Sequence, residues 1–439
     1  MYSIFPSSTI FSFELTRLLG STPNSGCDIA EFLSAVSKIK KNNPDSWFSA
    51  WTEQAIRAEK IAEDAATAGY GVLARNAYLR ACNYHRASHF MLIHPDERIL
   101  PSAQRSIGNF QKAIPLMEGR VLKVSIPYEK GLDLPGYLYL PPASSTRLQA
   151  GGRKSPVLVV LCGADSTKEE MHFMFADGAI QMGYAVLVFE GPGQGHVLKR
   201  KEIPLRPDFE VCTSKALDYL HAISKKDESL GLDVDIIAVV GASLGAYYAL
   251  RAATDSRIKA CVSIDPFFSL WEVAESRSPK AVFDLWVNGW LSDGFWNWSI
   301  ETHCKVNFPT RWEFGLGKWM TGYKEPADVL RRFRDFSLDT TIDGNILEKV
   351  KCPVLITSAD QAMYTSAETS ALRIHRSLTN VTEDCKEVWA PKDAADGGLT
   401  GKVGAWPLML QKSFEFLDKH FEVKRTLLLD PPSSREQGS

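Results

Sequence analysis

The sequence predicts an α/β protein in which helices flank a mostly parallel central sheet and two further helical regions are attached to that core. The first observation is a set of short, continuous apolar runs, which are typical of strands buried on both faces. These runs lie at 157–162, 185–189, 236–240 and 259–264. The second observation is that helical segments separate the runs, and this alternation is typical of parallel strands joined by crossover helices.

The first 120 residues differ from the rest because their pattern is mostly helical. Ile29, Phe32, Leu33 and Val36 recur at helical spacing, which places them on one face of a helix. An alanine-rich stretch at 58–66 also favours a helix. Two strands are then predicted at 121–127 and 132–140. We therefore expect 1–120 to form a helical N-terminal segment that contributes to a lid, followed by the first part of the core at 121–265.

The core resumes after a long insertion. Strands are predicted at 353–357 and 386–389, and a helix at 405–421, within a second core part at 347–421. The insertion, 266–346, is too long to be a simple loop and must carry structure of its own. It is rich in tryptophan: 271, 286, 290, 296, 298, 312 and 319. We expect a tryptophan-rich helical cap there, and a tail at 422–439.

Composition excludes several classes of function. The chain has 50 Lys and Arg against 52 Asp and Glu, and this balance gives no basic surface for nucleic acid or an anionic membrane. No apolar stretch is long enough to span a membrane, and no targeting segment is predicted. The eight cysteines occur singly, which predicts neither a metal site nor a redox motif. We expect a cytoplasmic protein with a small-molecule partner and without a cofactor, and leave open whether it forms a homodimer.

A Gly-x-Ser-x-Gly motif spans Gly241 to Gly245 and lies between a predicted strand and a predicted helix. In this context the motif indicates a nucleophile elbow, a sharp turn that exposes the Ser243 hydroxyl above the sheet. Glycines flank such a serine because side chains would clash in the tight turn. The same turn directs the backbone N–H of Leu244 toward an oxyanion position. Ser243 and Leu244 are therefore the first candidate site residues.

With this motif the sequence resembles the α/β-hydrolase family. Three segments narrow the resemblance: Asp165-Ser-Thr-x-Glu169-Glu170, Phe189-Glu190-Gly-Pro-Gly-Gln-Gly195 and Ser243-Leu-Gly. Together they resemble the fungal secondary-metabolite hydrolases of the fusarin-cluster and yellowish-green pigment type, over residues 35–421. The resemblance implies an α/β-hydrolase fold and a polyketide or polyketide–amino-acid substrate. It also implies that the backbone N–H of Ala164 is the second oxyanion donor.

This sequence has candidates for the acid of a catalytic triad, but it lacks a histidine where the base is expected. The resemblance places the acid at Asp360, just past a late strand, and Asp265 at the end of the fourth strand of the alternating core is the alternative. The loop at 390–404 should carry the histidine but contains none, and Thr400 or a near neighbour occupies its place. His196 and His303 are candidates for a relocated base. The charge run at 199–201 is typical of a solvated loop.

The missing histidine leaves three functional hypotheses. Serine is a poor nucleophile without a base, so the first is a C–C bond-forming enzyme of aldol or Knoevenagel type. Under this first hypothesis Ser243 lies at the floor of a pocket under the cap and donates a hydrogen bond to the substrate oxygen that becomes negatively charged. Asp360, buried there with a raised pKa, acts as the base. The second is a serine hydrolase with a relocated base. The third is a binding protein that retains the fold without the chemistry.

Overall fold

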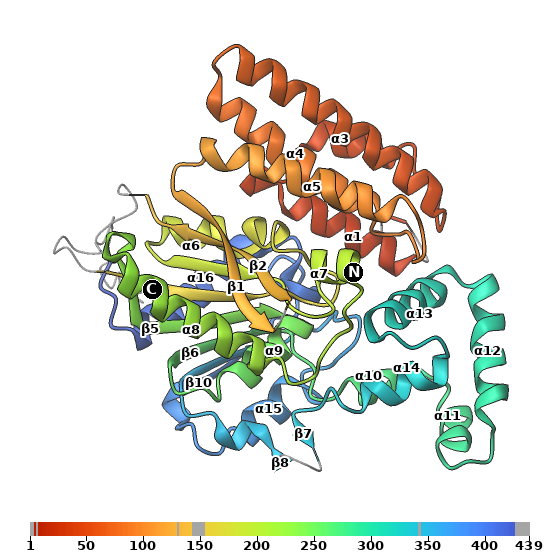
Figure 1. Cartoon of the computed structure of the whole chain (residues 1–439). Helices are drawn as coiled ribbons and strands as arrows, with labels where there is room; N and C mark the ends of the chain where they lie inside the picture. Colours follow the sequence, from red (N-terminus) through yellow and green to blue (C-terminus); the bar gives the residue numbers. More distant parts are fainter. Residues whose placement is uncertain (1–3, 6–7, 130, 143–153, 341–343, 426–439) are drawn as a thin grey trace, which may run out of the picture.

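An eight-stranded sheet forms the centre of the molecule (Figure 1). The computed structural model describes residues 4–5, 8–129, 131–142, 154–340 and 344–425. The sheet has the order β1-β2-β4-β3-β5-β6-β9-β10. Its strands are β1 (Arg120–Glu129), β2 (Leu132–Leu140), β3 (Ser155–Leu161), β4 (Ala185–Phe189), β5 (Leu232–Ala242), β6 (Ile258–Ile264), β9 (Val354–Thr357) and β10 (Lys386–Trp389). The predicted tail from 426 onward lies outside the described residues.

Most neighbouring strands of this sheet are parallel. β1 and β2 form an antiparallel hairpin, and β2 pairs antiparallel with β4, whereas β4, β3, β5, β6, β9 and β10 pair in parallel. Every residue of β4 is buried, as the continuous apolar run predicted. The predicted fold class is therefore confirmed. Because parallel strands end at one edge, the turns after β3, β5, β6 and β9 lie together, and ligands usually bind at such an edge.

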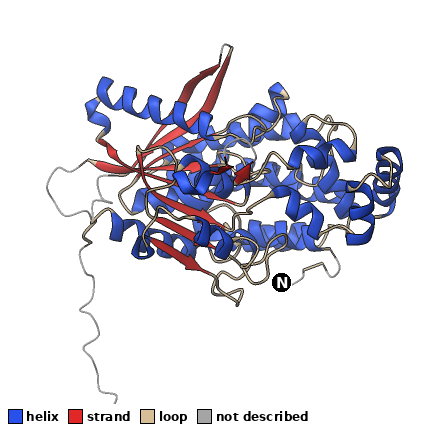
Figure 2. Cartoon of the chain, turned by 90° about the horizontal axis from the view of Figure 1, so that it is seen from below, coloured by secondary structure: helices blue, strands red, loops and turns tan. Residues whose placement is uncertain are grey.

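Helices cover both faces of the sheet (Figure 2). The core helices are α6 (Asp177–Gln181), α7 (Gly195–Lys201), α8 (Glu210–Lys226), α9 (Leu244–Ala252), α15 (Ala371–Ser377) and α16 (Trp406–His420). The helix that follows the loop after β3 is capped by Thr167, whose Oγ1 accepts a hydrogen bond from the Glu170 N–H at 3.3 Å. The loop predicted at 199–201 is wrong, because these residues end α7. Arg200 and Lys201 are exposed as expected, whereas Lys199 is half-buried.

Five helices lie above the sheet in Figure 1 and belong to the first 113 residues. They are α1 (Thr9–Gly20), α2 (Ile29–Val36), α3 (Pro44–Thr67), α4 (Gly71–Ser88) and α5 (Ile99–Ala113). Asp28 caps α2 by accepting two backbone N–H groups, and Asn43 caps α3, which begins at a proline. Trp47, Trp51 and Tyr84 are buried between these helices. The segment therefore has an aromatic core of its own.

The insertion between β6 and β9 is a helical cap, drawn at the lower right of Figure 1. Its helices are α10 (Leu270–Ser276), α11 (Lys280–Val287), α12 (Asp293–Val306), α13 (Phe308–Thr321) and α14 (Pro326–Phe333). Trp286 and Trp296 stack at 4.7 Å within a small core of the cap. By contrast, Trp290 and Trp298 are exposed. The cap tryptophans thus divide between packing and surface positions, and only two face the site described below.

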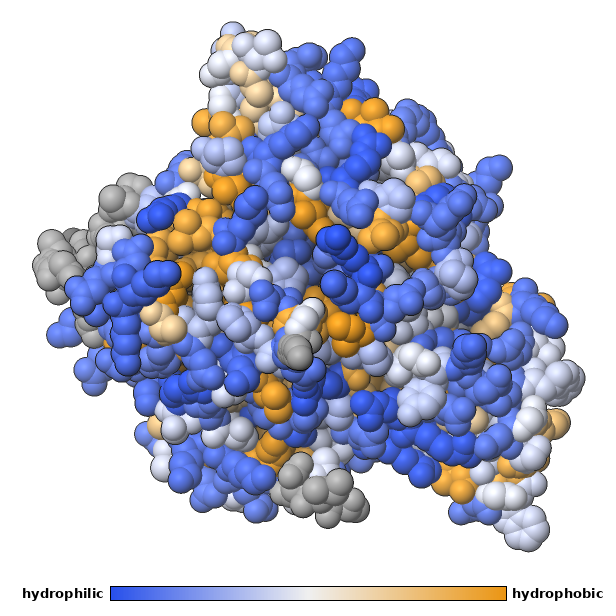
Figure 3. Space-filling model, viewed as in Figure 1, coloured by the Kyte–Doolittle hydropathy of each residue, from blue (hydrophilic) through white to orange (hydrophobic). Residues whose placement is uncertain are grey.

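The outer surface of the molecule is mostly hydrophilic on the face drawn in Figure 3. Apolar side chains gather on that face at the outer end of the cap, over α11 and α12. The exposed apolar residues of these two helices are Val282, Leu285, Val287, Phe295, Trp298 and Val306. None of the helices in the described part of the chain is long and apolar enough to cross a membrane.

Candidate active site

Ser243 occupies a sharp turn between β5 and α9. Its backbone has φ 55° and ψ −117°, a left-handed conformation that L-residues rarely adopt. The Ser243 N–H donates a hydrogen bond to the Ile264 carbonyl at 2.9 Å, which ties the turn to the end of β6. The predicted strand, turn and helix are therefore present, with the serine at the tightest point.

The glycines on either side of Ser243 are required by close backbone contacts. A Cβ on Gly241 would lie 2.2 Å from the Gly245 carbonyl oxygen, and one on Gly245 would lie 2.4 Å from the Leu161 carbonyl oxygen. Ser243 itself is exposed and does not line the pocket described below. The expectation that the cap encloses it at a pocket floor is therefore wrong. The cap packs over the neighbouring oxyanion loop instead.

The oxyanion loop, residues 162–167, follows β3 and carries Ala164. The turn after β4 supports it, because Gln194 Nε2 donates to the Cys162 carbonyl at 2.6 Å. The Gln194 side chain also accepts the Gly191 N–H at 2.9 Å, so the Gly-Pro-Gly-Gln-Gly segment is locked against this loop. The segment quoted in the family resemblance therefore positions the loop that is expected to hold an oxyanion.

A buried ionic network joins the oxyanion loop to the N-terminal helices. Arg17 on α1 donates to Asp165 at 2.6 Å and to Glu170 at 2.5 Å. Arg86 on α4 pairs with Glu14 at 2.7 Å. Burial opposes ionisation of Asp165, but the Arg17 guanidinium outweighs it and lowers the pKa of that carboxyl. The helices at the N-terminus thus fix the position of the loop next to Ala164.

We expect Arg17→Met to destabilise the protein by about 3–5 kcal/mol, because it leaves buried carboxylates without their cation. The variant should also lower turnover, since Asp165 adjoins the oxyanion donor Ala164. Denaturant unfolding and a kinetic assay check the two effects. Arg257→Met is the matched control: its pairs with Asp218 and Asp255 are partly exposed, so its cost should stay below about 1 kcal/mol. Equal effects of the two variants would contradict the prediction.

Asp265, at the end of β6, is the buried carboxylate beside the serine turn. Its Oδ1 accepts hydrogen bonds from Thr357 Oγ1 at 2.7 Å and from Lys402 Nζ at 2.8 Å. Its Oδ2 accepts the Gly401 N–H at 2.8 Å. Lys402 is 0% exposed and also donates to the Ser358 carbonyl at 2.6 Å. Burial lowers the pKa of Lys402, an effect that Asp265 opposes.

The loop between β10 and α16 therefore faces an acid, but it presents an ammonium group where the resemblance implies an imidazole. Thr400 does not face Asp265, since its Oγ1 accepts the Met363 N–H at 2.7 Å. The residue in contact with the carboxylate is Lys402, two positions later. Ser243, Asp265 and Lys402 all have positive φ values, between 50° and 55°. Such strain in non-glycine residues clusters at functional sites.

Asp360 does not have the burial that its assignment as a base requires. Its side chain is exposed, and its backbone N–H donates to the Pro391 carbonyl at 3.3 Å. The expectation that the cap buries Asp360 is wrong, because the cap contacts Met363 and Tyr364, a few residues later, and leaves the Asp360 side chain exposed. The alternative acid, Asp265, has the buried position and the hydrogen-bond partners that a triad acid needs.

The two candidate histidines lie in different surroundings. His303 is exposed on α12, which forms the outer edge of the cap in Figure 1. His196 is half-buried in the first turn of α7, and its Nδ1 is buried without a hydrogen-bond partner among the described residues. Burial lowers the pKa of His196. Of the two, only His196 lies beside the oxyanion loop.

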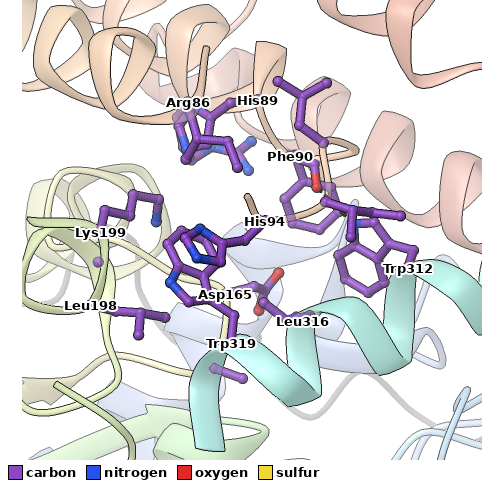
Figure 4. Close-up of a pocket in the computed structure, with 15 residues that line it drawn as sticks. Arg86, His89, Phe90, His94, Asp165, Leu198, Lys199, Trp312, Leu316 and Trp319 are labelled. Carbon is purple, nitrogen blue, oxygen red and sulfur yellow. Dashed lines mark hydrogen bonds between the residues drawn. The ribbon is translucent and has the colours of Figure 1, made fainter. Parts of the chain in front are cut away.

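A pocket of about 50 Å³ lies between the N-terminal helices, the oxyanion loop, α7 and α13 (Figure 4). Ala164 and Asp165 line it from the oxyanion loop, and Lys199 lines it from α7. Trp312 and Trp319 line it from the cap, and Trp312 Nε1 donates to the Phe90 carbonyl at 2.7 Å. The sequence does not predict this pocket, because its walls come from four distant segments.

Comparison with known proteins agrees with the fold and the motifs. Residues 28–289 match the family model described as esterase FrsA-like. The α/β hydrolase xenA of Xenoacremonium sinensis is 53% identical over 96% of this chain and 99% of its own length. The 20-hydroxy-prefusarin hydrolase FUS2 of Gibberella moniliformis is 42% identical over 98% of this chain and 100% of its own. The resemblance to fungal secondary-metabolite hydrolases is thereby confirmed.

Solved structures show the same fold at lower identity. The 2,6-dihydroxy-pseudo-oxynicotine hydrolase has a TM-score of 0.67 at 22% identity, covering 92% of this chain and 95% of that one. AbyA5 has a TM-score of 0.60 at 16% identity, covering 94% of this chain and 95% of its own. The match spans the N-terminal helices, the core and the cap together.

Proposed function

The chain is an α/β-hydrolase enzyme of the FrsA-like esterase family, and from this premise we propose that it forms C–C bonds in a polyketide-type intermediate of fungal secondary metabolism. Relatives in secondary metabolism, among them a prefusarin hydrolase, support the substrate class. The reaction is an aldol or Knoevenagel-type cyclisation, in which an activated C–H carbon attacks a carbonyl carbon of the same molecule.

The main support for this proposal is the ion pair between Asp265 and Lys402. In a serine hydrolase the acid orients a histidine, which removes the serine proton. Here Lys402 Nζ and the Gly401 N–H hold the buried carboxylate. Lys402 also has a second acceptor in Ser358. A cation held this way is a poor proton acceptor, because losing its charge would leave Asp265 buried without a counterion. Ser243 thus lacks the usual route to activation.

The remaining groups suit the stabilisation of an enolate. The backbone N–H groups of Leu244 and Ala164 are the proposed oxyanion donors, and the Ser243 hydroxyl adds a third hydrogen bond. Each such donor contributes about 3–4 kcal/mol in related sites. In this role Ser243 needs no base, because it donates a hydrogen bond and keeps its proton.

Hydrolysis with a relocated base is the second candidate, and a specific observation favours it. His196 has an unpartnered Nδ1 beside the oxyanion loop, and the relatives carry hydrolase names. The two functions differ in whether Ser243 attacks the substrate. The third hypothesis, a non-catalytic binding protein, is set aside because the chain belongs to an enzyme family.

We expect the protein to cleave p-nitrophenyl acetate slowly, at a rate within about tenfold of the Ser243→Ala variant. The reason is that removing the base of a serine triad costs on the order of 10⁴ to 10⁶ in turnover. Release of p-nitrophenolate measures the rate. A natural enzyme that exceeds Ser243→Ala by about 10⁴-fold would prove that a base exists and would favour hydrolysis. His196→Gln then tests whether that base is His196.

A further inference from the structure

Arg86 and Lys199 line the pocket in Figure 4, and its carboxylate, Asp165, is already paired with Arg17 at 2.6 Å. His89 also lines it, but burial lowers the pKa of His89 and its Nδ1 donates to the His85 carbonyl at 2.9 Å, so its other ring nitrogen is an acceptor. Arg86 Nη1 is buried without a hydrogen bond among the described residues. The nearest recorded carboxylate oxygen, on Glu170, is 3.6 Å from it. Such a lining fits a ligand that supplies acceptor oxygens.

Trp319 adds a second unsatisfied donor. Its Nε1 is buried without a partner among the residues that the structure describes. Its ring stacks on His94 with the two centroids 4.5 Å apart and the planes 5° apart, so its orientation is fixed. Buried donors without acceptors are costly and need an explanation. Carbonyl oxygens of a bound substrate would satisfy both Arg86 and Trp319.

Lys199 has no carboxylate partner among the residues that the structure describes. No carboxylate lies within 4.0 Å of its Nζ in the described ranges, although its side chain is half-buried. The reason is that Glu190, the acid beneath α7, is occupied. It accepts the His196 N–H at 2.8 Å and the Lys168 N–H at 3.0 Å, and pairs with Lys168 Nζ at 3.2 Å. Lys199 Nζ instead lies 5.9 Å from the centroid of the Trp319 ring.

The position of Lys199 is fixed by the start of α7. Gly195 has φ 40°, and a Cβ there would lie 2.0 Å from Glu190 Oε1. The helix can therefore begin only at a glycine, and its first residues are held against Glu190. Lys199, one turn later, then lines the same pocket as Ala164 of the oxyanion loop.

We propose that Lys199 is the catalytic base, and that the pocket donors hold the two carbonyl oxygens of a 1,3-dicarbonyl group while it acts. This inference rests on the proposed C–C chemistry. Unprotonated Nζ accepts the proton of the carbon between the carbonyls. The C–H bond breaks, and its electron pair moves onto a carbonyl oxygen as an enolate. The enolate carbon then attacks a separate carbonyl carbon elsewhere in the same molecule, whose C=O π pair moves onto its oxygen, and the Lys199 ammonium gives the proton to this new alkoxide.

The charges around Lys199 determine its pH response. The facing groups are Arg86 and His89 on α4, Asp165, Lys168 and Glu169 after β3, Glu190 after β4, His94, and His196 on α7. Burial lowers the pKa of Lys199, while Glu190, Asp165 and Glu169 oppose that change. Because the base is the unprotonated form, the rate should rise with pH through this lowered pKa and then level.

The size of the pocket limits what it binds. A cavity of about 50 Å³ has room for only a few water molecules, so a small head group fits and a long chain does not. Binding of a longer chain then requires displacement of α13, which carries Trp312 and Trp319. The pocket is thus assigned to the reacting head of the substrate and not to its chain.

Hydrogen–deuterium exchange tests the proposal without needing the natural substrate. The probe is an acyclic β-ketoamide without an electrophile, so that it exchanges its C–H between the carbonyls but cannot cyclise. NMR in D₂O measures exchange above the uncatalysed rate. Lys199→Met removes the base and Lys199→Arg keeps only the charge. Both should lose about 10²-fold or more of the enzymatic exchange. Arg200→Met, the exposed neighbour on α7, should keep it.

The outcomes separate this inference from the proposed function. Exchange by the natural enzyme and by Lys199→Arg at the same rate would overturn the role of Lys199 alone. Trapping of the lysine as a borohydride-reduced imine would also overturn it. No exchange by the natural enzyme would reject the C–C chemistry together with its base. Thermal unfolding of each variant confirms that the comparison is between folded proteins, since methionine and arginine both suit a half-buried helical position.

Discussion

Ser243→Ala is expected to lower the formation of a cyclised product by about 10² to 10³, the cost of one oxyanion hydrogen bond. The probe is a β-ketoamide that also carries an aldehyde, so that it can cyclise by C–C bond formation. Liquid chromatography of the product measures the rate. The fold should not change, because alanine accepts the φ of 55° as readily as serine does.

The size and the pattern of this loss separate the two mechanisms. If Ser243 attacks the substrate, Ser243→Ala should cost on the order of 10⁴ to 10⁶. Ser243→Cys then keeps a nucleophile and should retain activity. If Ser243 only donates a hydrogen bond, Ser243→Cys should lose about as much as Ser243→Ala, because a thiol is a weak donor. An active cysteine variant would contradict the hydrogen-bond role.

Lys402→Met is expected to destabilise the protein by about 3–5 kcal/mol, because Asp265 is then left buried without its cation. Denaturant unfolding measures the change. The double variant Asp265→Asn/Lys402→Met should recover part of the loss, since an amide needs no counterion. Lys419→Met is the matched control, as its pair with Glu387 is exposed on both sides, and its cost should stay below about 1 kcal/mol.

A loss from Lys402→Met as small as that of the control would mean that Lys402 is neutral or readily displaced. Such a result would contradict the ion pair on which the proposed function depends. It would also mean that a histidine side chain could replace Lys402 beside Asp265, so Lys402→His should be measured in the same experiment. An ester hydrolysis rate that rises in Lys402→His would show that Asp265 is placed to act as a triad acid.

Much of the fold was predictable because its signals are local. The continuous apolar run at 185–189 predicted β4 with the bounds that the structure has, and the strand predicted at 386–389 is β10. The Gly-x-Ser-x-Gly spacing predicted the turn at Ser243, since the glycines are required by contacts within a few residues and with the next strand. The charge run at 199–201 misled the prediction. Charge alone does not show that Gly195 begins a helix, or that Lys199, one turn later, lines a pocket.

The site was less predictable because its contacts join distant segments. Asp265 pairs with Lys402, and Arg17 reaches Asp165. No local pattern encodes either pairing. His196, His303 and Asp360 were the expected bases, whereas the roles of Lys199 and Lys402 depend on their burial, which no local pattern in the sequence indicates. Asp360 follows a strand as expected, but whether a loop carboxylate is buried depends on where the cap packs, which its own neighbours in sequence do not determine.

The reactivity of Ser243 toward a fluorophosphonate tests the central claim most directly, because this reagent labels a serine only when a base activates it. Intact-protein mass spectrometry follows the adduct over time, with Ser243→Ala as the blank. We expect Ser243 to stay unlabelled under conditions that fully label an active serine hydrolase. Rapid, stoichiometric labelling of Ser243 would contradict the claim that this enzyme keeps the elbow serine as a hydrogen-bond donor.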